Sequence, residues 1–129
     1  MPGIYGYTKA SAQDDQLAQM EARLNRSGGL EKEDDFQDDK VAASRLHIAN
    51  VEQNSASFFK DGVYISIEGE LYGDSLQPFE QQLYDAYTDD RLDQYLNQLD
   101  GYFNAVIYDS TRGKISLISD RYGMRMLYY

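Results

Sequence analysis

The chain has 129 residues, of which 42% are hydrophobic, and carries a formal net charge of −10 at pH 7. The length and apolar content predict one globular domain over residues 1–129. So acidic a chain repels phosphate backbones and anionic lipid, and it has neither a secretory start nor an apolar run of about twenty residues, so we expect a cytoplasmic protein that binds no nucleic acid and no membrane.

The first strand and the first helix are predicted from glycine placement and from a helical repeat. Residues 3–7 are typical of a strand in which two glycines permit close backbone approach. Ser11 and Asp14 fit a capping box, which predicts that a helix begins there. Its apolar stripe falls at positions 17, 20 and 24, and Gly28-Gly29 is expected to end it.

An acidic stretch and a second strand follow. Residues 31–39 are mostly acidic, but their spacing does not match a calcium loop, so we expect a solvated loop. Residues 41–49 predict a strand, and Arg45 within it is interpreted as a rim residue whose charged end reaches water. His47 is the only His and the chain has no Cys, so we expect no metal site and a structural role for His47.

Hairpin signals and helical spacing predict the rest of the chain. Asp61-Gly62 between two β-rich runs is a strong hairpin signal, and Pro78 suits the first turn of a helix. Strands clustered in hairpins around helices predict an α+β fold. The remaining predicted elements are strands at 56–59 and 63–68, helices at 75–87 and 91–99, and strands at 101–109, 114–119 and 126–129.

Four short motifs, in order along the chain, are similar to those of one known family. They are Met1-Pro2-Gly3-Ile4-Tyr5-Gly6, then Ser44-Arg45-Leu46-His47-Ile48, then Ile67-Glu68-Gly69-Glu70-Leu71-Tyr72, and finally Leu99-Asp100-Gly101-Tyr102-Phe103 with Asp120-Arg121-Tyr122-Gly123 and Leu127-Tyr128-Tyr129. Together they resemble the glutaminase region of the asparagine synthetases, which are class II, N-terminal-nucleophile glutamine amidotransferases. The resemblance implies an αββα sandwich, here incomplete at the C-terminus.

The resemblance also implies a site, and this sequence departs from it. The family carries a Cys at position 2, whose own α-amine acts as the base, whereas Pro2 has no side-chain nucleophile. Arg45, by resemblance, binds the carboxylate of glutamine, and Gly69 and Glu70 also fit the substrate pocket. Glu68 stands where the family has an Asn that stabilises the oxyanion, which a carboxylate cannot do unless it is protonated.

Three functional hypotheses remain open. The first is a degenerate glutaminase-like domain that acts as a non-hydrolytic structural or partner domain of an ATP-dependent amide-forming synthetase, as in β-lactam synthetases and lasso-peptide cyclases. The second is an active glutamine-hydrolysing domain of an asparagine synthase in which position 2 has been altered. The third is an enzyme that uses the nitrogen of Pro2 as a general base after removal of Met1.

Cofactors and partners follow from the same comparison of motifs. The chain contains no glycine-rich phosphate loop, so we expect no cofactor here and assign ATP and Mg²⁺ to a synthetase domain or subunit, the implied partner. Strands at 115–119 and 126–129 are expected to lie at a sheet edge with unpaired backbone groups. Such an edge predicts that the chain self-associates, or that it is less stable than a complete parent protein.

Overall fold

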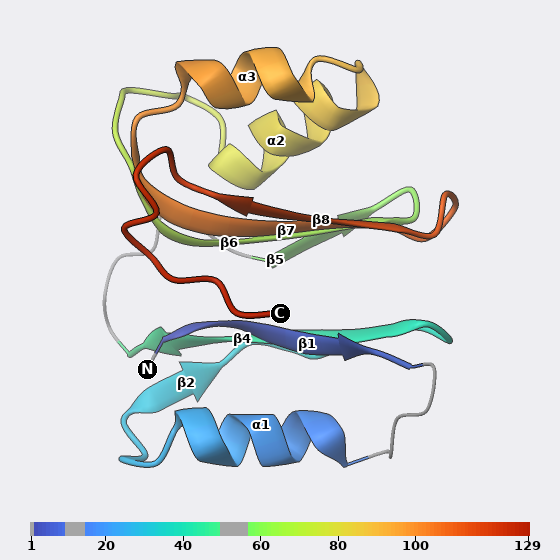
Figure 1. Cartoon of the computed structure of the whole chain (residues 1–129), viewed down its shortest axis with the longest axis vertical. Helices are drawn as coiled ribbons and strands as arrows, with labels where there is room; N and C mark the ends of the chain where they lie inside the picture. Colours follow the sequence, from blue (N-terminus) through green and yellow to red (C-terminus); the bar gives the residue numbers. More distant parts are fainter. Residues whose placement is uncertain (1, 10–14, 50–56) are drawn as a thin grey trace. The chain divides into compact units, whose positions relative to one another are not determined.

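The computed structural model describes residues 2–9, 15–49 and 57–129 and divides the chain into two compact units, Met1–Glu52 and Gln53–Tyr129. Both units combine antiparallel strands with helices, which confirms the α+β class (Figure 1). The capping box expected at Ser11 and Asp14 lies outside the described residues. No described helix has both the length and the apolar composition needed to cross a lipid bilayer.

The first unit is a small antiparallel sheet with one helix, α1 (Gln16–Leu24). Strand β4 is central, because β1 pairs with one of its edges and β2 with the other, and β3 also pairs with it. The strands are β1 (Gly3–Thr8), β2 (Leu30–Lys32), β3 (Phe36–Gln37) and β4 (Val41–Ile48).

Helix α1 packs on this sheet through the stripe predicted from the sequence. Leu17 is buried against strand residues, with Met20 and Leu24 packed around it. The helix ends at Leu24, before the glycines predicted to end it, because the next residue, Asn25, binds the start of β2 through its side chain. The Asn25 side chain donates to the carbonyl of Leu30 at 3.0 Å and accepts from its N–H at 3.1 Å.

The composition of the acidic stretch predicted a loop over its whole length. The structure instead contains two short strands there, β2 and β3. The N–H of Glu33 bonds to the carbonyl of Arg45 at 3.0 Å, and the N–H of Asp38 bonds to that of Val41 at 3.0 Å. Most of the carboxylates remain exposed while the backbone pairs. A high density of charged residues predicts that the side chains are solvated, but it does not predict whether the backbone pairs with a neighbouring strand.

The second unit is a sheet of four described strands in the order β5-β6-β7-β8, all antiparallel. Helices α2 (Phe79–Thr88) and α3 (Leu92–Gln98) cover one of its faces (Figure 1). The hairpin predicted at Asp61-Gly62 is confirmed, with φ values of 50° and 80°. The strands are β5 (Ser57–Lys60), β6 (Val63–Leu71), β7 (Gly101–Asp109) and β8 (Lys114–Ser119).

The core of the second unit lies between the sheet and the helices. Alternate residues of β6 and β7, among them Ile65 and Ile107, pack against Leu83 of α2. Helix α2 begins at Phe79, later than the predicted position 75. A side-chain turn at Ser75 precedes it, and the residue before a proline is steered away from helical backbone angles.

The prediction of a final strand at residues 126–129 is wrong. The segment after β8, residues 120–129, has no regular secondary structure and runs along the sheet face opposite the helices (Figure 1). Its contact with β7 is made by a side chain, because Asn104 donates from Nδ2 to the carbonyl of Met126 at 3.3 Å. A pattern of apolar residues alone cannot distinguish this path from a strand.

Candidate functional site

Pro2 lies beside the start of β1, and Arg45 lies in β4, the strand that pairs with β1. Pro2 directly precedes β1, and Arg45 of β4 lies opposite Ile4. Paired residues of an antiparallel ladder share a face, and so do residues two apart on one strand. Pro2 and Arg45 therefore lie on the same face of this sheet, opposite the face that packs on α1 through Tyr5 and Leu46.

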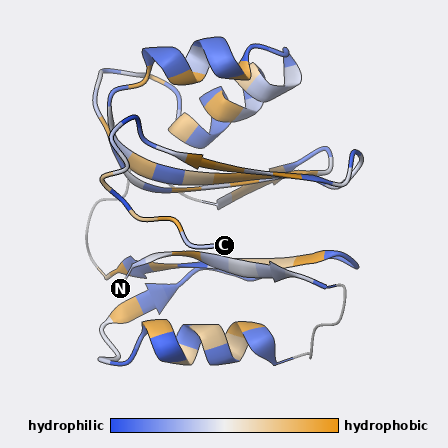
Figure 2. Cartoon of the chain, viewed as in Figure 1, coloured by the Kyte–Doolittle hydropathy of each residue, from blue (hydrophilic) through white to orange (hydrophobic). Residues whose placement is uncertain are grey.

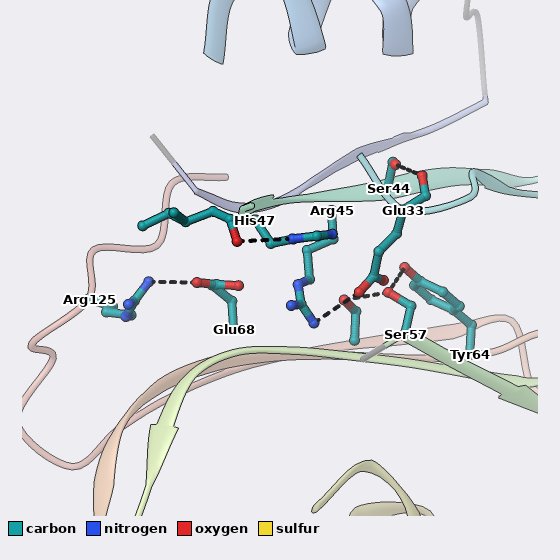
Figure 3. Close-up of polar contacts among 10 residues, drawn as sticks. Glu33, Ser44, Arg45, His47, Ser57, Tyr64, Glu68 and Arg125 are labelled. Atoms are coloured by element: carbon teal, nitrogen blue, oxygen red, sulfur yellow. Dashed lines mark hydrogen bonds and ion pairs between the residues drawn. The ribbon is translucent and has the colours of Figure 1, made fainter. Parts of the chain in front are cut away.

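Arg45 is 1% exposed, so its interpretation as a rim residue was wrong. It lies in the middle of the central strand, where neighbouring strands cover both sides. Its Nη1 forms an ion pair of 3.2 Å with Oε1 of Glu33, whose backbone N–H also bonds to Arg45 (Figure 3). Sequence reasoning missed Glu33, because the register that sets it beside Arg45 is not visible in the spacing of charges.

Glu68, Gly69 and Glu70 follow one another near the end of β6 in the second unit. Gly69 has a φ of 126°, and a Cβ at this position would lie 2.2 Å from the carbonyl oxygen of Tyr102 on β7. Only glycine suits this close approach of two strands. Glu68 and Glu70 point to the opposite face from the buried Ile67, which is the face without helices.

Each of these two carboxylates has a partner on that face. Oε1 of Glu68 forms an ion pair of 3.2 Å with Nη1 of Arg125 (Figure 3). Tyr102 donates its hydroxyl proton to Glu70 at 2.7 Å, and Arg125 stacks over the Tyr102 ring at 5.4 Å. The hydrogen bond to Glu70 raises the pKa of Tyr102, since a phenolate would face that carboxylate.

The position of Arg125 is set by a polar corner at Asp120. One carboxylate oxygen of Asp120 accepts from the N–H of Tyr122 at 2.9 Å and of Met124 at 3.2 Å. Burial alone would raise the pKa of Asp120, but these backbone bonds outweigh it and lower the pKa. The Asp-Arg-x-Gly motif indicated a corner, but no sequence signal placed Arg125 beside Glu68.

An open pocket of about 480 Å³ lies between β8 and the irregular segment that follows it. Arg125 is its only basic lining residue, and Ser119, Leu117 and Tyr128 also contribute. The described part of the chain contains no group of three or more His, Asp or Glu side chains that could hold a metal ion.

Antiparallel sheets with helices packed on one face make this an α+β protein. Residues 79–129 match a family described as a glutamine amidotransferase domain, which indicates such a domain in this chain. The matched range lies within the second unit and includes Arg125 and Tyr102. Pro2, Arg45 and Glu68 lie outside it. A comparison with curated proteins gave no match.

Proposed function

We propose that this chain is a glutaminase-type domain related to the asparagine synthetases, with an N-terminal-nucleophile fold, that has lost its nucleophile. It serves as a non-hydrolytic partner of an ATP-dependent amide-forming synthetase. The observation that carries the proposal is Pro2, which shares a sheet face with the buried Arg45. A class II glutaminase needs a side-chain nucleophile at this position, and Pro2 provides none.

The charges at the other site positions support the same proposal. A glutamine carboxylate that approached Arg45 would compete with Glu33, which already forms an ion pair with it. At the oxyanion position, Glu68 is a carboxylate and would repel the negative charge that develops on the substrate. Glu68 already forms an ion pair of 3.2 Å with Arg125, and its carboxylate offers no N–H donor of the kind that an Asn side chain offers.

The fold of each unit supports the relationship. The described part of the first unit packs one helix, and the second unit two, on one face of an antiparallel sheet, which is what one half of an αββα sandwich requires. By resemblance, Arg45, Gly69 and Glu70 match positions at which the family binds glutamine. The domain would keep these residues without hydrolytic chemistry, while ATP and Mg²⁺ would bind to the synthetase partner.

We expect the chain to release no glutamate from glutamine above a blank. Glutamate release by Pro2→Cys alone is also expected to stay below detection, because the Glu68 carboxylate would still repel the negative charge of the oxyanion. The double variant Pro2→Cys/Glu68→Asn is expected to gain covalent labelling by an electrophilic glutamine analogue, read by intact mass, with Glu68→Asn alone as the unlabelled control. The same mass measurement reports whether Met1 has been removed, which the new Cys requires.

Retention of Arg45, Gly69 and Glu70 favours a second candidate, an active amidotransferase domain in which only position 2 is altered. Robust glutamine hydrolysis by Pro2→Cys alone would establish this candidate and contradict the loss of function at Glu68. Glutamate release by the unaltered chain would contradict the first proposal. In that case, activity after removal of Met1 that is lost when Met1 is retained would implicate the nitrogen of Pro2.

A further inference from the structure

Strand β8 lies at one edge of the four described strands of the second unit, and it exposes two large apolar side chains. Ile115 and Leu117 are 38% and 47% exposed and lie on the face opposite α2 and α3. Ile118 points to the other face and packs on the core. Figure 2 shows β8 coloured largely as hydrophobic. The only charged residue of the strand is Lys114, at its first position.

The outward backbone groups of β8 can be assigned from one hydrogen bond. The N–H of Asp120 bonds to the carbonyl of Phe103 at 2.9 Å, one step beyond the last ladder pair, Asn104 with Ser119. In an antiparallel ladder, bonded and non-bonded pairs alternate. Ser116 and Ile118 therefore bond to β7, whereas the N–H and C=O groups of Ile115 and Leu117 point away from it.

We propose that β8 pairs antiparallel with β8 of a second copy of this chain, so that the two sheets of the dimer become continuous. A two-fold axis normal to the sheet keeps the same face upward in both copies. With Ser116 opposite Ser116 of the other copy, Ile115 of each copy lies opposite Leu117 of the other. Both residues then use their outward backbone groups for bonded pairs, and their exposed side chains pack together.

A second copy suits this edge because the strand is self-complementary. In the proposed register, Lys114 lies opposite the apolar Ile118 of the other copy, so no like charges meet. The strand also lacks the mid-strand charge or proline that usually blunts an edge. The net charge of −10 makes two copies repel at long range, so added salt is expected to strengthen the dimer.

Sedimentation equilibrium of the whole chain over a range of protein and salt concentrations tests the proposal. We expect twice the monomer mass at high protein concentration, with dissociation shifted to lower concentration by salt. Leu117→Lys is expected to give a monomer at every concentration, because the lysines at position 117 of the two copies would then lie close together across the paired β8 strands. Phe59→Lys is the matched control, since Phe59 is 57% exposed on β5 at the other end of the sheet, and it is expected to leave the dimer unchanged.

The register has its own test, because the chain contains no Cys of its own. Ser116→Cys places two thiols across the proposed axis in a non-bonded pair, where side chains approach most closely, so mild oxidation is expected to give a disulfide-linked dimer. A monomer at every concentration, or a dimer that survives Leu117→Lys, would overturn the proposal. Thermal unfolding by circular dichroism shows that each variant is folded. None of these outcomes depends on glutaminase activity.

Discussion

Replacing Gly69 by alanine is expected to destabilise the second unit by about 4 kcal/mol. The φ of 126° at Gly69 is a left-handed conformation that L side chains rarely adopt. The added Cβ would also meet the carbonyl oxygen of Tyr102 at 2.2 Å and the Cα of Phe103 at 2.7 Å. These are backbone atoms of β7, so a rotamer change cannot relieve the clash, and β6 and β7 must separate.

Gly73→Ala is the control that separates the two parts of this effect. Gly73 has nearly the same φ, 123°, but a Cβ there would meet nothing within 4 Å. Its replacement by alanine therefore incurs only the backbone strain, about 1 kcal/mol. Urea unfolding followed by circular dichroism gives both values. Equal losses for the two variants would show that the strands at Gly69 relax freely and that the close approach is unimportant.

Asp109→Ala is expected to cost about 3 kcal/mol, because the Asp109 carboxylate joins the β7–β8 turn to helix α2. It accepts from the N–H of Thr111 at 3.0 Å, from its hydroxyl at 2.6 Å, and from the N–H of Arg112 at 3.1 Å. Its second oxygen accepts from the hydroxyl of Tyr87 at 2.7 Å. Urea unfolding at neutral pH measures the loss. A loss below about 1 kcal/mol would mean that water replaces these bonds.

Asp109 also gives the stability a defined dependence on pH. Burial alone would raise its pKa, but the hydrogen bonds from Thr111, Tyr87 and Arg112 outweigh burial and lower it. A lowered folded-state pKa contributes stability above the unfolded value of about 4, and this contribution is lost as the pH falls through the folded pKa. Asp109→Asn should therefore lose less stability between pH 7 and pH 3 than the unaltered chain. Asp89→Asn is the control, because Asp89 belongs to an exposed surface ion pair, and it should leave the loss of stability between pH 7 and pH 3 as it is in the unaltered chain.

Local patterns in the sequence were sufficient to predict most of the regular elements. The Asp61-Gly62 turn requires left-handed angles that this dipeptide readily adopts, so it fixed the β5–β6 hairpin. The stripe at Leu17 identified the buried face of α1 because helical spacing aligns its side chains. Both signals arise from residues close together in the chain.

The site could be predicted only in part, because its contacts join residues far apart in the sequence. Arg45 was identified, but its burial and its pairing with Glu33 depend on the register between β4 and the residues after β2. The pairing of Glu68 with Arg125 likewise depends on the path of an irregular segment. The alternation of side chains along a strand predicts which face of the sheet each one is on. It does not predict which residue from a distant part of the sequence lies beside it.

The hydrogen bond from the N–H of Tyr72 to the carbonyl of Asp100, 2.8 Å long, has a consequence for the order of folding. It closes the segment that contains both α2 and α3 at the point where the central strands β6 and β7 meet. Closing a loop of roughly thirty residues costs about 2 kcal/mol more chain entropy than closing a two-residue turn. The β5–β6 and β7–β8 hairpins should therefore form first, and the barrier to folding should lie at their docking, which only the packed helices make favourable.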